Sequence, residues 1–177
     1  MVKDMQCKDL ETNRLTLKNI SMVDREFIYR HFSNDCVNEF LFDAEPIQTM
    51  EQADEIIRFY TDPVPAFWHR WIIIRKEDGV KIGTCGFHRW DQNKDTVEIG
   101  YDMSPEYWGK GYAIEAVGRL IEFTKDVLGV KKVHAHIYIQ NDRSVNLVKH
   151  LGFKPTGKKN EIFRGKPYLH HIYTLEL

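Results

Sequence analysis

The stretch Ser104-Pro105-Glu106-Tyr107-Trp108-Gly109-Lys110-Gly111-Tyr112-Ala113 decides the fold, because it joins a strand pattern to a helix pattern. Gly109 and Gly111 stand two residues apart, just before the helix pattern begins. Glycine tolerates the left-handed backbone, so neighbouring N–H groups can point into one concavity. The helix dipole adds positive potential at the same place. The stretch therefore predicts a phosphate or pyrophosphate site.

The sequence on either side of this stretch gives the neighbouring elements. The preceding residues 96–103 have the pattern of a strand, which follows two other strand patterns at 68–75 and 80–87. The following residues place one buried face along a helix that ends near Gly129: Ala113, Ala116, Val117, Leu120, Ile121 and Thr124. The three strands are joined by short loops, so we expect them to be antiparallel.

The remaining elements complete the predicted topology. We expect a first strand at 14–18, helices at 22–32 and 49–60, a strand at 132–139, a helix at 142–150 and two final strands from residue 153 onward. The strand–helix–strand step between residues 96 and 139 requires one parallel pairing. The prediction is an α+β fold in a single domain, with a central mixed, mostly antiparallel sheet flanked by helices.

Composition limits the classes of function. The 177 residues carry 25 Lys plus Arg against 26 Asp plus Glu, a net charge of −1, which gives no overall attraction to nucleic acid or to an anionic membrane. No apolar run approaches the roughly 20 residues of a membrane span. The three cysteines lack CxxC spacing, and His134 and His136 have no third ligand fixed by spacing, so we expect no metal site. We expect a cytoplasmic protein without nucleic-acid or membrane partners.

The ligand of the glycine stretch is not one of the two commonest nucleotides. The ATP-binding pattern G-x-x-x-x-G-K-[ST] is absent, because Tyr112 follows Lys110-Gly111. The dinucleotide pattern G-x-G-x-x-G fails at its third glycine, where Ile114 stands. The sequence therefore favours a ligand that contains a diphosphate but is neither ATP nor NAD.

The stretch instead resembles the acyl-CoA motif Q/R-x-x-G-x-G/A of the GNAT superfamily of N-acetyltransferases. The segments that resemble its RimJ/RimL-like branch are PEYWGKGYAIEA at 105–116, EIGY at 98–101, N-x-x-S at 141–144, LGF at 151–153 and ETNRL at 11–15. The resemblance implies an N-acetyltransferase domain over residues 11–177, after an N-terminal extension of residues 1–10. It departs from the family at Glu106, where Gln or Arg is usual.

The resemblance implies acetyl-CoA as cosubstrate and assigns the residues that bind it. Gly109, Lys110, Gly111, Tyr112 and Ala113 would hold the pyrophosphate, mainly through backbone N–H groups, and Lys110 alternatively lies free in solvent. The family separates two strands of its sheet and uses the exposed backbone N–H groups there. By this likeness Tyr101 and Met103 would contact the acetyl and pantetheine portions, unless their N–H groups pair within the sheet. Asn141 would bind the pantetheine arm, or act only as a helix N-cap.

The implied reaction is attack of a neutral amine on the thioester, which needs a proton acceptor and a donor to the leaving thiolate. Glu98 is the candidate base, and His88 is an alternative. Glu98 could instead form a structural ion pair with a cation. Ser144 is the candidate donor to the sulfur, or a polar residue of the first helical turn. Tyr138 and Tyr173 are other possible acids. No cysteine has the partner that a covalent acyl-cysteine route needs.

The acceptor side is predicted from charge. Residues 34–62 hold one basic residue, Arg58, four aromatic residues and eight acidic residues: Asp35, Glu39, Asp43, Glu45, Glu51, Asp54, Glu55 and Asp62. Such a segment would attract a cationic amine, or it forms an ordinary solvated surface. The acceptor is then a protein N-terminus or a small amine such as a polyamine, amino acid or antibiotic.

Two other classes of function remain open at this point. One is an acyl-CoA-binding sensor without catalysis, and the other is a nucleotide-binding module that shares the loop. The sequence is compatible with either a monomer or a homodimer.

Overall fold

The computed structural model describes residues 7–62 and 67–177, so most of the predicted N-terminal extension lies outside it. Within these residues eight strands form one sheet in the order β1-β2-β3-β4-β5-β6-β8-β7. The strands are β1 Leu10–Glu11, β2 Leu15–Asn19, β3 His69–Arg75, β4 Lys81–Asp91, β5 Thr96–Met103, β6 Lys132–Tyr138, β7 Lys154–Phe163 and β8 Lys166–Glu176. Only β5 and β6 pair in parallel. This confirms the predicted mixed, mostly antiparallel sheet.

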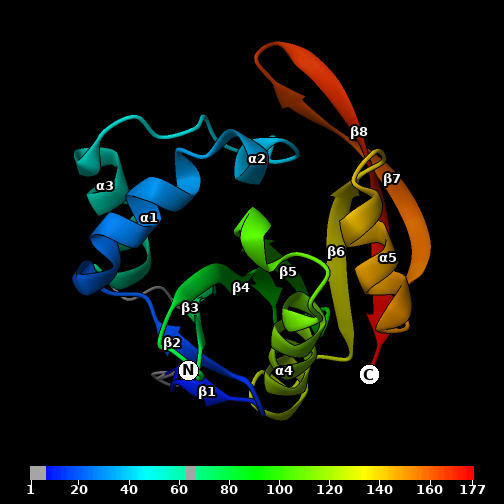
Figure 1. The fold of residues 1–177 in the computed structure, drawn as a ribbon. Coiled ribbons are helices and arrows are strands. Elements are labelled where there is room, and N and C mark those ends of the chain that lie inside the picture. Colours follow the sequence, from blue (N-terminus) through cyan, green and yellow to red (C-terminus); the bar gives the residue numbers. More distant parts are fainter. Residues whose placement is uncertain (1–6, 63–66) are drawn as a thin grey trace.

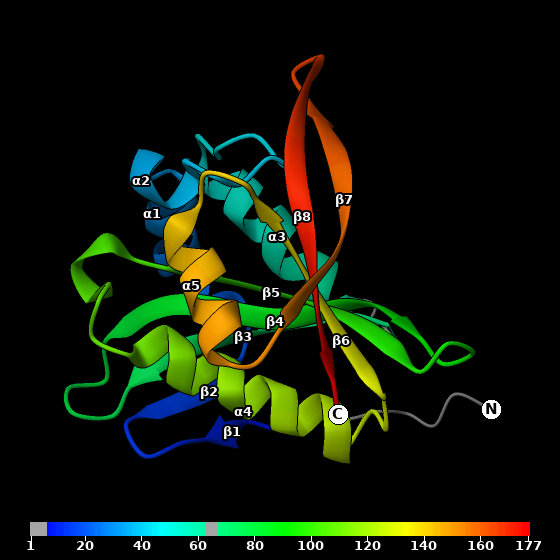
Figure 2. The ribbon, with the colours of Figure 1, turned by 90° about the vertical axis from the view of Figure 1, so that its right-hand side faces the viewer.

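Helices flank this sheet. They are the 3-10 turns η1 Met22–Asp24 and η2 Pro105–Tyr107, and the α-helices α1 Arg25–Phe32, α2 Asp35–Asn38, α3 Met50–Thr61, α4 Tyr112–Asp126 and α5 Asp142–His150. Figure 1 shows α1, α2 and α3 gathered together, apart from α4 and α5. Figure 2 shows the long β7–β8 hairpin projecting beyond the rest of the sheet. No helix among the described residues has the length and apolar character needed to cross a membrane.

The core consists of two apolar layers on opposite faces of the sheet. On β3, Trp71 and Ile73 belong to the cluster that includes α4, while Ile72 belongs to the cluster formed with α1 and α3. Alternate residues of a strand point to opposite faces, which explains why the run Trp71–Ile74 is apolar throughout. Strand β3 is thus covered on both faces, and it fixes α1 and α3 on the face opposite α4.

Local sequence signals explain where the helices begin. Helix α3 starts with a capping box, in which Thr49 Oγ1 accepts from the Gln52 N–H and Gln52 Oε1 accepts from the Thr49 N–H. Helix α5 starts at the predicted N-cap, where Asn141 Oδ1 accepts from the Ser144 N–H at 3.2 Å. The predicted helix 22–32 is divided into η1 and α1. The short elements β1 and α2 were not predicted.

Strand β4 passes through Gly86, which interrupts an otherwise clear strand pattern. A Cβ built on Gly86 would lie 2.1 Å from the backbone oxygen of His69 on β3. The two backbones approach too closely for a side chain, so glycine serves the strand pairing here.

Candidate active site

A gap opens in the middle of the sheet. Strands β5 and β6 pair only from Thr96 and Lys132 to Glu98 and His134, although both strands continue. The N–H of Ser104 donates to β4 at 2.8 Å. Because backbone groups alternate in direction along a strand, the N–H groups of Tyr101 and Met103 point away from β4, into the gap. The expected separation of two strands is present. The binding role of these N–H groups stays a prediction.

The glycine loop lies at the beginning of α4. Gly109 and Gly111 have φ angles of +72° and +79°, in the left-handed region, and Gly111 is the N-cap of the helix. A Cβ built on Gly109 would meet nothing within 4 Å, so the loop is open on that side. Left-handed glycines before a helix N-terminus form a concave set of N–H donors. The local conformation therefore fits a pyrophosphate group.

Two cationic side chains, Arg14 and Lys110, lie at this loop. Arg14 donates to the backbone oxygen of Lys110 at 3.0 Å and pairs with Glu115 at 2.6 Å. Its guanidinium also lies 4.5 Å from the centre of the Tyr112 ring. Arg14 thus fixes the loop to the start of α4, and Lys110 itself is exposed. Arg14 was expected only as part of the ETNRL segment and of the first strand, because nothing local signals a contact about 100 residues away.

A pocket of about 590 Å³ lies beside the gap. Six of the candidate site residues named from sequence line it, namely His88, Glu98, Tyr101, Tyr138, Asn141 and Ser144. The loop residues 109–113 do not line it and form a separate group at the start of α4. This volume is in the range of small-molecule sites. The arrangement separates a phosphate-binding end from a pocket in which a second molecule can be held.

Asn141 and Ser144 come from the first turn of α5. Asn141 caps the helix, and both residues line the pocket, so its capping role leaves room for ligand contact. The Tyr101 hydroxyl donates a long hydrogen bond, 3.5 Å, to the backbone oxygen of Ser144. Burial raises the pKa of Tyr101 to about 12, so this phenol stays protonated. Hydroxyl donors are therefore present on the α5 side of the pocket.

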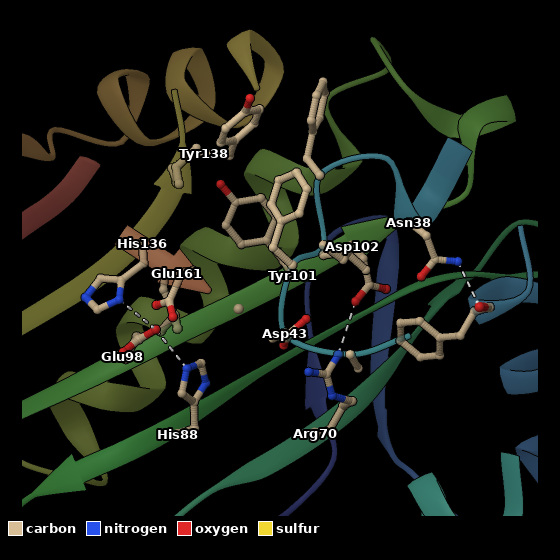
Figure 3. A pocket seen from close by; sticks show the side chains of 18 of the residues that line it. Asn38, Asp43, Arg70, His88, Glu98, Tyr101, Asp102, His136, Tyr138 and Glu161 are labelled. Carbon is tan, nitrogen blue, oxygen red and sulfur yellow. Dashed lines mark hydrogen bonds and ion pairs between the residues drawn. The ribbon is translucent and has the colours of Figure 1, made fainter. Parts of the chain in front are cut away.

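Glu98 lies between two imidazoles at the other end of the pocket (Figure 3). Its Oε1 is 2.9 Å from His88 Nε2 and 3.3 Å from His136 Nδ1, and its Oε2 accepts from Arg89 at 2.8 Å. Burial alone would raise the pKa of Glu98, but His88, His136 and Arg89 lower it to about 2. The ion pairs that the sequence left as an alternative for Glu98 are therefore present. A carboxylate this acidic is a weak proton acceptor.

A second charged cluster forms the far side of the pocket (Figure 3). Arg70 Nη1 donates to Asp102 at 3.1 Å and to Thr84 at 2.6 Å. The imidazole of His31, fully buried, lies 2.6 Å from Asp102. Burial raises the pKa of Asp102, but His31 and Arg70 more than offset this and lower it. The cluster is a fixed, ionised wall, and only its Asp102 and Arg70 members line the pocket.

The predicted acceptor segment contributes to the pocket only in part. Its aromatic residues Phe40, Phe42, Phe59 and Tyr60 line the pocket, but of its eight acidic residues only Asp43, Glu45 and Glu55 do so. Phe42 stacks on Tyr168 with ring centres 4.0 Å apart, and Glu45 pairs with Arg164. These contacts join residues 39–45 to the β7–β8 hairpin. The other acidic residues serve surfaces and helix contacts away from the pocket.

The cysteines do not supply a nucleophile to the pocket. Burial raises the pKa of the Cys7 and Cys85 thiols to about 12, so neither forms a thiolate at neutral pH. Cys36 is exposed on α2 and does not line the pocket. Within residues 7–62 and 67–177, no group of three or more His, Cys, Asp or Glu side chains is placed to hold a metal ion.

Several residues of the pocket were missed or assigned differently from sequence, among them Arg70, Asp102, Glu161 and His136. Glu161 of β7 lines the pocket and pairs with Lys159 at 2.7 Å, and no sequence motif pointed to it. His134 and His136 were considered from sequence only as a pair without a third metal ligand. His134 bonds to Thr174 within the sheet at 2.8 Å, whereas His136 lines the pocket. Two residues apart on a strand, the two histidines share one face of the sheet, but this spacing does not indicate that His136 and not His134 reaches the pocket.

Comparison with known proteins gives a consistent family. A family model described as an acetyltransferase (GNAT) domain matches residues 14–154. The chain is 32% identical over 169 residues to the uncharacterized N-acetyltransferase p20 of Bacillus licheniformis. This alignment covers 95% of this chain and 94% of that protein.

Solved structures share the fold at lower identity. The spermidine N-acetyltransferase of Vibrio cholerae, solved in complex with CoA and spermine, has a TM-score of 0.81 at 20% identity and covers 93% of this chain and 96% of that chain. A Vibrio cholerae protein provisionally assigned as a ribosomal-protein-serine acetyltransferase has a TM-score of 0.79 at 18% identity, with full coverage of both chains. At these identities the likeness concerns the fold alone.

Proposed function

Because the chain belongs to the GNAT family of acetyltransferases, we propose that it moves the acetyl group of acetyl-CoA to a primary amine by direct attack in a ternary complex. The observation that carries this proposal is the gap between β5 and β6: residues of both strands beside it line the pocket, and β5 leads along the chain into the glycine loop. A thioester in the gap and an amine in the pocket would meet without a covalent enzyme intermediate. The high thiol pKa values of Cys7 and Cys85 support the same route.

The residues around the gap suit acetyl-CoA. Gly109 and Gly111 would hold the pyrophosphate through N–H groups, and the exposed Lys110 would add positive charge that offsets the carboxylate of Glu106, whereas the charge of Arg14 is paired with Glu115. The N–H groups of Tyr101 and Met103 would bind the pantetheine arm and the thioester oxygen. Donors already fixed in position stabilise the charge that develops on that oxygen during attack.

The remaining predicted residues would serve proton transfer. Ser144 would donate a hydrogen bond to the departing thiolate, and Asn141 would position the pantetheine arm. Glu98 would act on the acceptor side. Its low pKa favours a carboxylate that stays charged and stabilises a positive neighbour over one that takes the proton itself.

The acceptor is a primary amine that enters the pocket end on. A protein N-terminus is one candidate, as the RimJ/RimL-like motifs imply. A small amine such as a polyamine is the second, and the closure of the pocket favours it, because Phe42 and Glu45 connect residues 39–45 to the β7–β8 hairpin. Asp43 and Glu55 line the pocket without an ion pair among the described residues, so either candidate would find negative charge there.

Calorimetry and an amine panel test the proposal. Acetyl-CoA should bind with micromolar affinity, about −8 kcal/mol, whereas ATP and NAD should not. The panel contains spermidine, a peptide with a free N-terminal serine, and the same peptide with its N-terminus blocked and one internal lysine. Acetylation of at least one amine, read by mass spectrometry, supports the proposal. Tight acetyl-CoA binding without transfer to any amine would support the sensor instead.

A further inference from the structure

His136 occupies the point where β5 and β6 separate. The last paired residues are Glu98 and His134, and His136 follows two residues later on the same face of β6. Its side chain is 16% exposed and lines the pocket. Nδ1 faces Glu98 Oε1 at 3.3 Å, as Figure 3 shows, and is buried without a well-formed hydrogen bond in the described structure. The other ring nitrogen, Nε2, makes no hydrogen bond to any residue that the structure describes.

We propose that His136 takes the proton from the attacking amine through Nε2, and that Glu98 holds the imidazolium that results. This rests on the proposed function. The Glu98 carboxylate, 3.3 Å from Nδ1, favours the neutral tautomer with hydrogen on Nδ1, which leaves Nε2 as the basic nitrogen. Glu98 is then a positioning residue that stabilises the charged form of His136.

The position of the gap favours His136 over the other imidazole beside Glu98. His136 lies on β6, which borders the gap. His88 lies on β4, and β5 stands between that strand and the gap. The His88 side chain is 39% exposed, so its proton exchanges with solvent more freely than that of His136.

The surroundings of His136 keep it neutral at pH 7. Burial lowers its pKa, Glu98 and Glu161 raise it, and Lys159 and Arg89 lower it, with a net decrease. The titratable groups around it are Glu98 and His170 on the adjoining strands β5 and β8, and His88, Arg89, Lys159 and Glu161 on the next strands, β4 and β7. A neutral imidazole can accept a proton, whereas Glu98, with a pKa of about 2, holds one poorly.

The proposed step balances. The amine nitrogen forms a bond to the carbonyl carbon, and the carbon–sulfur bond breaks with its electron pair leaving on sulfur. One proton passes from nitrogen to His136 Nε2. The thiolate, hydrogen-bonded by Ser144, takes a proton from water, and the imidazolium returns its proton to solvent. No oxidant or other reactant is required.

The test compares His136→Gln with His134→Gln, with the amine that the panel identifies as acceptor. Glutamine keeps polarity but cannot take a proton at this pH. His136→Gln should lower kcat about 100-fold or more, the usual contribution of a general base, while the Kd of acetyl-CoA stays unchanged. The control His134→Gln alters a neighbouring imidazole that bonds to Thr174 in the sheet, and it should change kcat little.

The pH profile adds a readout that a merely structural role would not move. In the unmodified protein kcat should fall at acidic pH with a midpoint below 6.5, the ordinary histidine value, because protonated His136 cannot act as base. This limb should vanish in His136→Gln and remain in His88→Gln. A pH dependence caused by ionisation of the amine substrate itself would remain in both variants. Retention of kcat and of the acidic limb by His136→Gln would overturn the proposal.

A measurement on the unmodified protein keeps the proposal separate from the proposed function. Nitrogen-15 spectra of the histidine rings report which ring nitrogen carries hydrogen. His136 should be neutral at pH 7 with hydrogen on Nδ1. Hydrogen on Nε2, or a charged ring at pH 7, would refute the assignment of the base whether or not any amine is acetylated. Absence of transfer with the expected tautomer would refute the proposed function alone.

Discussion

Replacement of Gly109 by alanine separates the role of the glycine loop in folding from its role in binding. Gly109 and Gly79 form a matched pair, with φ angles of +72° and +71°, and a Cβ on either would meet nothing within 4 Å. Gly79 lies in the turn between β3 and β4, whereas Gly109 precedes α4. A left-handed alanine costs about 1–2 kcal/mol, so both variants should lose that much stability.

Only Gly109→Ala should weaken acetyl-CoA binding. The open space beside Gly109 is where the pyrophosphate would approach the backbone, and a methyl group there would displace at least one N–H contact. Hydrogen bonds to charged groups contribute about 1.5–3 kcal/mol, which corresponds to about a 10- to 100-fold increase in Kd. Urea unfolding measures the stability change, and calorimetric titration with acetyl-CoA measures the affinity. Equal affinities of Gly109→Ala and Gly79→Ala would refute the assignment of the loop.

Three further predictions concern the wall of the pocket and the sheet. Gly86→Ala should lower the free energy of unfolding by about 3 kcal/mol, the upper end for overpacking, because its Cβ would lie 2.1 Å from the His69 backbone oxygen. Urea unfolding measures this change, and a loss of less than about 1 kcal/mol would contradict the close approach. Asp102→Asn should cost about 3–5 kcal/mol by leaving the Arg70 guanidinium without its counter-ion, and a thermal unfolding midpoint equal to that of the unmodified protein would contradict it. Glu98 has a folded pKa of about 2 against 4.5 for the free side chain, so its contribution to stability is complete above pH 4.5 and is lost as pH falls toward 2. The free energy of unfolding of Glu98→Gln should therefore fall less steeply between pH 4.5 and pH 2 than that of the unmodified protein. Parallel plots of unfolding free energy against pH for the two proteins would argue against the ion pairs.

Most of the elements could be predicted because their signals are local. Two of these signals, the capping box at Thr49 and Gln52 and the N-cap at Asn141, each lie within one helical turn. The apolar face of α4 repeats over a few turns of one helix. The parallel pairing of β5 and β6 followed from chain connectivity. The missed elements β1 and α2 are only two and four residues long, too short to show a period.

The site was predicted less completely, because its contacts join distant parts of the chain. The sequence placed Glu98 on the right strand, but it did not indicate that Arg89, His88 and His136 would all reach this carboxylate. Arg14 contacts Lys110 and Glu115 across about 100 residues. Such contacts depend on sheet order and register, which no local pattern specifies.

The binding of acetyl-CoA in the gap between β5 and β6 is the central claim, and backbone amide NMR during titration with acetyl-CoA tests it most directly. The amide signals of Tyr101, Met103, Gly109 and Gly111 should shift together with one saturation curve, while that of Gly79 stays in place. Saturation with acetyl-CoA that leaves the Tyr101 and Met103 amides unmoved would contradict the claim.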